Sequence, residues 1–309
     1  MFSDKPESNG LTRRGFLSGT AAAAVAAPMG LAGIARAAEE TGADKMTSME
    51  TMNKYGEELL NMLVLRTYPI AIKMLKDEGE IPQGAVRPKK DLKEHYSACQ
   101  AFGLVRQRGM TIAMFIEDHW CFEPIVGYGL VKFPEEFEEG AGSDYFINDK
   151  EAAKERNNSM PVLPFGRFRG MALAPLHKTN FVPDLTVIYC NAAQLRHMLF
   201  SLMLPKGYRV NSTLDPVWSC IHSVVPSLLT GECKVTVPDF GEFLRGAVSD
   251  NEMMITIPTE KMEEMMSGVY QYDKMGMGYR DIGRELKNDF RQPPFYREYF
   301  KKWGLDTQE

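Results

Sequence analysis

The chain has 309 residues, of which 44% are hydrophobic, 25% charged and 10% aromatic, and its formal net charge is −5. This balance is typical of a globular protein and argues against a disordered chain, a collagen-like repeat or a coiled coil. The acidic charge offers no basic surface, so we expect no nucleic-acid partner. Five cysteines are an odd number and too few for a disulfide scaffold.

The first 37 residues have the three-part layout of an export signal. Arg13 and Arg14 stand just before a weakly apolar run rich in Ala and Gly, and residues 35–37 place small side chains at the positions that a signal peptidase reads. The arginine pair indicates the twin-arginine (Tat) route, which carries folded proteins and often their cofactors. A membrane anchor is the alternative, but the run is interrupted by Pro28 and is shorter than the ~20 apolar residues of a span.

Cleavage after residue 37 would remove four basic and two acidic residues, which changes the formal charge from −5 to −7. No later segment has about 18 uninterrupted apolar residues, so we predict no membrane span in the mature chain. Residues 38–47 are polar and are predicted to be a linker. The sequence therefore predicts an acidic periplasmic protein.

Hydrophobic periodicity predicts mixed helices and strands from Ser48 onward. Ser48 can cap a helix whose apolar stripe reaches Leu65, and a strand follows at residues 68–75. After a charged loop, a helix is predicted over residues 92–108, with Gly109 as its stop. The next predicted elements are a strand at 111–116, a helix that begins at 122 and a charged helical excursion over 133–158.

The second half continues this irregular alternation. It is predicted to contain strands at 170–175 and 185–190, helices over 192–204 and 217–229, strands at 233–237 and 253–257, and a helix from Thr259 to about 270. Because no fixed repeat is present, we predict a single mixed α+β domain over residues 48–270.

Residues 271–309 are predicted to be a helical C-terminal extension. Its aromatic side chains share one helical face, and they are Phe295, Tyr296, Tyr299, Phe300 and Trp303. That face either docks on the parent domain or forms a surface for a redox partner or a second copy of the chain.

The five cysteines lack the short spacings of common metal and redox motifs. No pair has C-x-x-C spacing, which excludes a zinc ribbon, a thioredoxin motif, a bacterial ferredoxin run and a covalent c-type haem. Glycine-rich dinucleotide and phosphate loops are absent too, as is Gly-x-Ser-x-Gly. Any metal site must therefore use dispersed ligands.

Three cysteines stand beside other groups that can bind or react. Cys99 lies within a predicted helix, Cys121 follows His119 and Trp120 at a strand end, and Cys220 lies near a helix start. Backbone N–H groups at such ends can bond sulfur or lower the pKa of a thiol. Each cysteine can equally be a small hydrophobic core residue. Core packing is the first interpretation for Cys190 and Cys233, with a disulfide as an alternative in an oxidising periplasm.

Several stretches of the domain carry a family resemblance. They are residues 56–59, 68–73, 98–101 (Ala-Cys-Gln-Ala), 117–121 (Glu-Asp-His-Trp-Cys) and 250–253 with 257–258. With them the chain resembles the bacterial and archaeal family called domain of unknown function 169. The resemblance implies that Cys99 and Cys121 belong to the family pattern, and Cys220 more loosely. It brings no activity with it.

Our first hypothesis is an exported redox or metal protein. Cys99, Cys121 and Cys220 would hold an iron–sulfur cluster, and His119, Asp118 or another cysteine would be the fourth ligand. One alternative is a cofactor-free periplasmic protein that binds a small molecule or a subunit. The other is a cysteine-dependent enzyme, with Cys121 as nucleophile and His119 as base.

Overall fold

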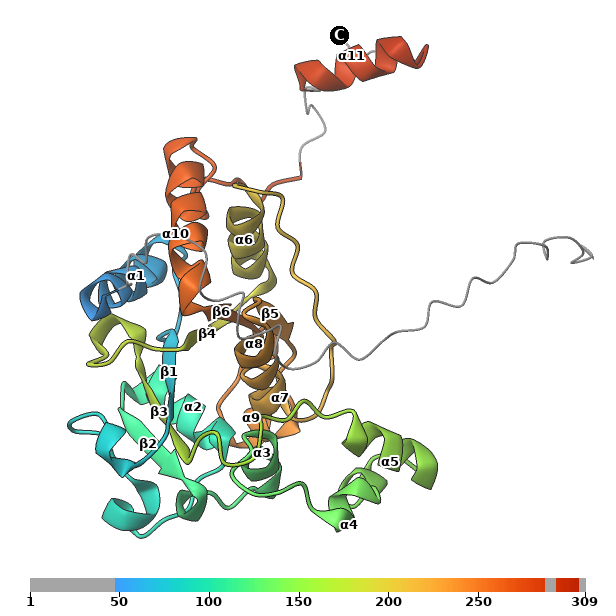
Figure 1. Cartoon of the computed structure of the whole chain (residues 1–309). Coiled ribbons are helices and arrows are strands. Elements are labelled where there is room, and N and C mark those ends of the chain that lie inside the picture. Colours follow the sequence, from blue (N-terminus) through green and yellow to red (C-terminus); the bar gives the residue numbers. More distant parts are fainter. Residues whose placement is uncertain (1–47, 287–292, 306–309) are drawn as a thin grey trace, which may run out of the picture. The chain divides into compact units, whose positions relative to one another are not determined.

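A computed structural model describes residues 48–286 and 293–305. The predicted signal peptide and linker, residues 1–47, lie outside the described residues, and so do parts of the C-terminal extension. Figure 1 shows the arrangement of the elements.

Six strands form one sheet in which every pairing is antiparallel. The spatial order is β2-β3-β1-β4-β6-β5. The strands are β1 (Ile70–Leu75), β2 (Ile112–Phe115), β3 (Gly170–Pro175), β4 (Leu185–Cys190), β5 (Lys234–Thr236) and β6 (Met253–Pro258). β1 therefore lies inside the sheet and pairs with two strands from the middle of the chain, β3 and β4.

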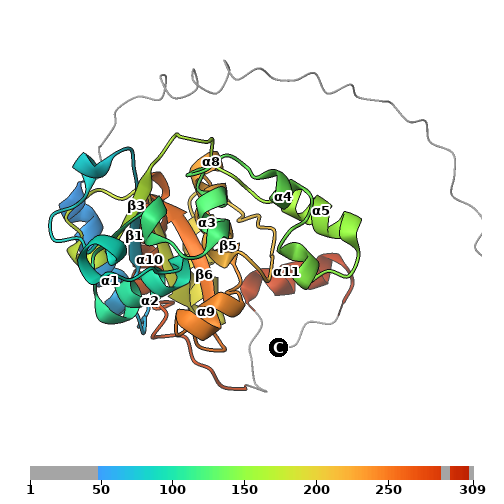
Figure 2. The same ribbon diagram turned by 90° about the horizontal axis from the view of Figure 1, so that it is seen from below.

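Helices cover both faces of the sheet, so that the domain has three layers (Figures 1 and 2). On one face lie α1 (Met49–Met62), α6 (Ala192–Met203) and α10 (Thr259–Lys274). On the other face lie α2 (Ala98–Arg108), α3 (Phe122–Gly127), α7 (Ser219–His222) and α8 (Val225–Thr230). A strand that is buried on both faces needs apolar residues at every position, and this explains runs such as LTVIYC in β4.

The remaining helices have four to nine residues. α4 (Glu135–Glu138) and α5 (Lys150–Asn158) pack against each other, and α9 (Phe240–Arg245) packs against α2 (Figure 2). α11 (Pro294–Lys302) buries none of its residues. Short turns of 3₁₀ or π type are η1 (Glu78–Glu80), η2 (Pro88–Leu92), η3 (Ile116–Asp118), η4 (Ser143–Tyr145) and η5 (Leu176–Lys178).

The α+β fold class is confirmed, and each predicted strand is present within two residues of its predicted bounds. The predicted helix over 92–108 begins only at Ala98, because η2 ends in the left-handed residue Lys93 and Ser97 caps the later start. The predicted helix over 217–229 is divided into α7 and α8, with Pro226 in the first turn of α8. α9 was not predicted.

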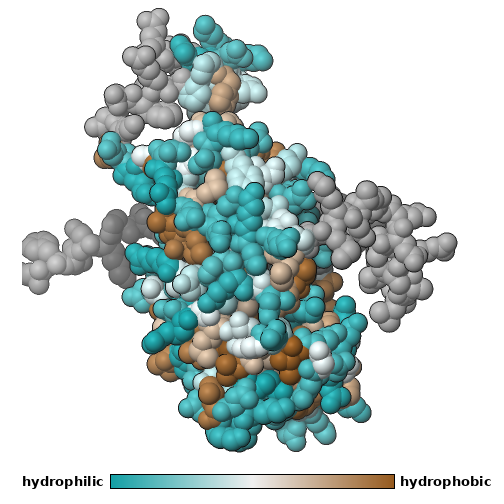
Figure 3. Space-filling view, turned by 90° about the vertical axis from the view of Figure 1, so that its left-hand side faces the viewer, coloured by the Kyte–Doolittle hydropathy of each residue, from teal (hydrophilic) through white to brown (hydrophobic). Residues whose placement is uncertain are grey.

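Among the residues that the structure describes, no helix combines the length and the apolar character needed to cross a bilayer. The face shown in Figure 3 is mainly hydrophilic, with apolar residues in separate spots.

Candidate functional site

A cavity of about 310 Å³ opens on the α2 side of the sheet, and three of the five cysteines line it. We call it the cysteine pocket. Its walls come from the start of α2, the segment before and within α3, Phe146, the segment that enters α7, and α9. The cysteines are Cys99, Cys121 and Cys220, which are the three that the sequence singled out.

Cys99 is positioned by the cap of α2. Ser97 caps the helix, and its backbone N–H donates a hydrogen bond to the side-chain oxygen of Gln100 (2.9 Å). The Ser97 hydroxyl also lies 3.0 Å from the Cys99 sulfur. The Gln100 side-chain oxygen accepts a second hydrogen bond from the Trp120 indole (2.8 Å). The Ala-Cys-Gln-Ala stretch therefore holds both Cys99 and the neighbouring pocket wall in place.

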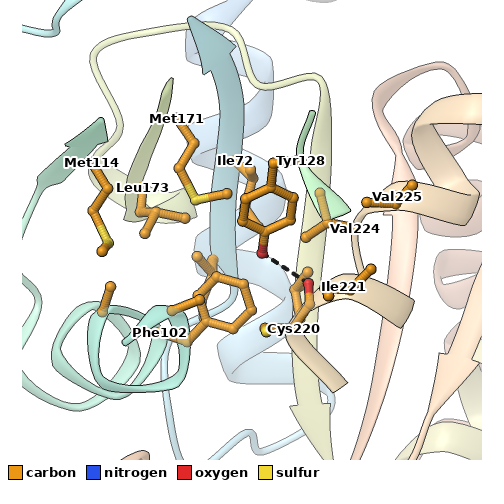
Figure 4. Packing of buried hydrophobic residues seen from close by; sticks show 14 of the residues in the cluster. Ile72, Phe102, Met114, Tyr128, Met171, Leu173, Cys220, Ile221, Val224 and Val225 are labelled. Atoms are coloured by element: carbon orange, nitrogen blue, oxygen red, sulfur yellow. Dashed lines mark hydrogen bonds between the residues drawn. The ribbon is translucent and has the colours of Figure 1, made fainter. Parts of the chain in front are cut away.

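Cys121 precedes α3 and donates its S–H to the Glu123 carboxylate (2.9 Å). Cys220 lies in α7, and its backbone carbonyl accepts a hydrogen bond from the buried Tyr128 hydroxyl (2.9 Å; Figure 4). Figure 4 also shows Phe102 of α2 beside Cys220 within the packed cluster. Both sulfurs thus come from short elements that rest on the core.

Asp239 ties α7 to α9. One of its carboxylate oxygens accepts from the Ser219 N–H (2.8 Å), and the other caps α9 through the Glu242 N–H (3.0 Å). Trp218, the residue just before α7, has a left-handed backbone (φ 59°), which is a strained conformation for a large side chain. This geometry turns the chain so that both Trp218 and Cys220 line the cysteine pocket.

All three pocket thiols are neutral near pH 7 in the metal-free protein. Burial, and then Glu242, raise the pKa of Cys99 to about 11. Burial, and then Glu123, raise the pKa of Cys121, and burial with Asp239 raises that of Cys220 well above its usual range. The charge of a Cys99 thiolate would raise the other two further, so the three sulfurs form one electrostatic group.

Two side chains of α9 at or beside the pocket were not singled out from the sequence. Glu242 is completely buried, and neither of its carboxylate oxygens has a hydrogen-bond partner among the described residues. Burial, and then Asp239, raise its pKa to about 8. Arg245 lines the cysteine pocket, and its guanidinium carbon lies 4.4 Å from the centre of the Trp120 ring. Recognition of Asp239 as a helix cap after Pro238 would have found α9.

Asp118 and His119 are not among the residues that line the cysteine pocket. Asp118 is buried and accepts hydrogen bonds from Arg87 Nε (2.7 Å) and from the N–H groups of Lys89 and Phe115 (both 2.9 Å). His119 is buried with no partner for either ring nitrogen within the described part of the chain, and burial lowers its pKa to about 4. The stretch forms η3 rather than a continued strand.

Cys190 and Cys233 belong to the core on the opposite face of the sheet. Both are free thiols in the structure, as are the other three cysteines. The division of the cysteines into three and two therefore follows the two faces of the sheet. Across residues 48–286 and 293–305, no three His, Cys, Asp or Glu side chains are already arranged to hold a metal ion.

Comparison with known proteins gives one match. The family model of DUF169, described as Uncharacterised ArCR, matches residues 58–268. The matched segment contains the whole sheet and every cysteine. No curated protein and no solved structure matches the chain.

Proposed function

Because the chain belongs to the DUF169 family, whose description assigns no activity, we propose a function from the cysteine pocket itself. The protein holds an iron–sulfur cluster through Cys99, Cys121 and Cys220 and acts as a redox or metal protein. One observation carries the proposal: cysteines from three separate elements line a single pocket, while the other two are in the opposite core.

The donor set suits this group. Thiolates are the ligands that iron–sulfur clusters use, and a bound cluster would supply electron transfer or an open coordination position. The sulfurs are not preassembled for coordination, so the side chains must turn toward a shared centre. The Glu123 carboxylate already accepts a hydrogen bond from Cys121 and is placed to be a fourth ligand. The Asp118 carboxylate instead accepts three hydrogen bonds from other groups.

The neutral state of the thiols has a consequence for binding. Each thiol must lose a proton before its sulfur can bind a metal, so loading releases protons and becomes more favourable as the pH rises. Arg245 favours the deprotonated forms, because its charge lowers the pKa of Cys99 and Cys121 against the larger effect of burial.

Anaerobic purification tests the proposal. The protein should absorb visible light and contain iron and acid-labile sulfide, and Cys99→Ser, Cys121→Ser and Cys220→Ser should each lower both contents. Cys190→Ala and Cys233→Ala are matched controls, because they remove buried thiols from the opposite core and should leave the iron unchanged. A folded, colourless and iron-free protein would refute the proposal.

We also propose that the protein works in the periplasm after twin-arginine export. The support is the arginine pair before a weakly apolar run. Replacement of Arg13 and Arg14 by lysine should move the protein from the periplasmic to the cytoplasmic fraction of cells. A periplasmic protein that persists in this variant would contradict the assignment of the route.

A second candidate is a cofactor-free protein that binds a small molecule. It is favoured by the neutral thiols and by the aromatic and proline residues that make up much of the pocket wall. It predicts a metal-free protein that a ligand stabilises against heat. The position of His119 outside the pocket and the raised pKa of Cys121 weigh against a nucleophilic cysteine.

A further inference from the structure

Arg245 is the one basic residue among the described residues that line the cysteine pocket. The buried or half-buried arginines of the domain are paired, Arg87 with Asp118, Arg106 with Glu252 and Arg156 with Asp215, whereas Arg245 is exposed. For Arg245, the described part of the chain provides neither a carboxylate within 4.0 Å nor a hydrogen-bond acceptor. Its charge is therefore available to a ligand.

The guanidinium of Arg245 lies against one wall of the pocket. It stacks on the Trp120 ring, and Trp120 is in turn fixed by its hydrogen bond to Gln100. Near the guanidinium is Gly241, where a Cβ would lie 3.1 Å from Asp239 Oδ1, 3.2 Å from the Cys99 sulfur and 3.3 Å from Arg245 Nη1. The absence of a side chain at Gly241 thus lets the guanidinium and the sulfur share one part of the pocket.

The acidic groups of the pocket are already engaged. The Asp239 carboxylate accepts the N–H groups of Ser219 and Glu242, and the Glu123 carboxylate accepts the S–H of Cys121. Neither forms an ion pair with Arg245. Both carboxylates therefore accept hydrogen bonds from groups other than Arg245.

Aromatic side chains make up much of the remaining wall. Four aromatic side chains of the pocket remain well exposed, with exposed fractions of 47% for Trp120 and Phe122, 68% for Phe146 and 72% for Phe240. Aromatic surface of this kind around a cavity is typical of a site that a ligand covers.

We propose that the cysteine pocket binds a small aromatic carboxylate. The carboxylate would pair with Arg245 through two parallel N–H···O bonds, and the ring would lie against the aromatic walls. A cavity of about 310 Å³ admits a molecule with one ring. The inference rests on the proposed function only in that it uses the same pocket, and it names the class of molecule that the pocket takes.

Calorimetric titration of the purified full-length chain with benzoate tests this inference, with benzyl alcohol as the neutral counterpart of similar shape. Benzoate should bind about 10- to 100-fold more tightly than benzyl alcohol, as the loss of a charged hydrogen-bonded pair predicts. Arg245→Gln should remove this preference, and Arg245→Lys should restore part of it. Arg209→Gln, an exposed arginine that does not line the pocket, is the matched control.

Equal affinity for benzoate and benzyl alcohol, no binding of either, or an Arg245→Gln variant that keeps the preference would each overturn the inference. Circular dichroism of each variant shows whether it is folded. Iron content, measured on the same samples, separates the two proposals. Benzoate binding to a protein that purifies without iron would refute the cluster alone, whereas a protein that purifies with iron and, once freed of it, ignores benzoate would refute the carboxylate site alone.

Discussion

Glu242 is a buried carboxylic acid whose oxygens have no hydrogen-bond partner among the residues that the structure describes. Burial, and then Asp239, raise its pKa to about 8, well above the 4.5 of an ordinary glutamate. The folded chain therefore holds a proton that the unfolded chain has lost between these two pH values. The stabilising effect is complete below about pH 4.5 and is lost as the pH rises toward 8.

Glu242→Gln should remove this pH dependence. In the metal-free protein, the bound proton of Glu242 makes the free energy of unfolding fall as the pH rises from about 4.5 toward 8. The variant should lack this pH dependence and be more stable than the parent chain at pH 8. Urea denaturation across the pH range measures it, with the exposed Glu298→Gln as control. Parallel curves for parent and Glu242→Gln would disprove the assignment.

The sequence singled out the three cysteines that line the pocket and did not single out the two α9 residues, for a physical reason. Cys99, Cys121 and Cys220 stand beside strong local signals, which are a helix cap, a strand end and a helix start. Glu242 and Arg245 lie on a helix of six residues, which is too short for its apolar residues to establish a helical period, and their environment is created by residues far away in the chain. Burial of a single carboxylate depends on tertiary packing, which periodicity does not report.

At the scale of elements, Arg106 couples two helices that form the pocket. Its guanidinium extends from α2 and donates to the carbonyls of Gly246 (3.3 Å) and Ala247 (2.9 Å), just after α9, and to Glu252 (3.1 Å). Gly103 of α2 approaches closely as well, since a Cβ there would lie 2.9 Å from the Gly246 carbonyl. The helix that carries Cys99 and the helix that carries Arg245 are therefore fixed to each other.

Arg106→Met should destabilise the protein by about 3–5 kcal/mol, because it leaves a buried carboxylate and two carbonyls without their donor. Arg108→Met in the exposed last turn of the same helix is the control, and its effect should stay within about 0.5 kcal/mol. Chemical denaturation measures both. Similar losses for the two variants would show that Arg106 contributes only as an ordinary helical residue.

A second close contact joins α6 and α10. A Cβ on Gly268 would lie 2.3 Å from the Ser201 carbonyl oxygen, and backbone cannot move aside as a flexible side chain can. We expect Gly268→Ala to cost about 1–3 kcal/mol of stability, although alanine favours a helix. The exposed neighbour Ser267→Ala provides the comparison in thermal unfolding. An unchanged melting temperature for Gly268→Ala would mean that the helices separate without cost.

At the scale of the whole molecule, the sequence predicted every strand but not their order. Strands buried on both faces are uninterrupted apolar runs and are easy to locate. Which strand pairs with which depends on contacts between distant segments, and the runs themselves are alike. The division into α7 and α8 was also not predicted. One apolar stretch forms two helices there, and Pro226 lies in the first turn of the second.

The C-terminal extension can be tested by truncation. Because α11 buries none of its residues, a chain that ends at residue 286 should unfold within about 2 °C of the full chain. Light scattering on both forms then tests the predicted role of the aromatic face. A full chain that forms a dimer or larger assembly, together with a monomeric truncated chain, would assign the face to self-association. A large drop in melting temperature would instead show that the extension is part of the folded domain.

The strand order also governs how the protein is made. β1 pairs with β3, about 100 residues later in the chain. β4 pairs with β6, which is synthesised later and ends at Pro258. A ribosome must therefore complete most of the chain before the sheet can close, and until then β1 and β4 present unpaired edges. Synthesis that stops before residue 258 leaves an apolar strand without its partner, which makes prematurely terminated chains substrates for aggregation or for chaperones.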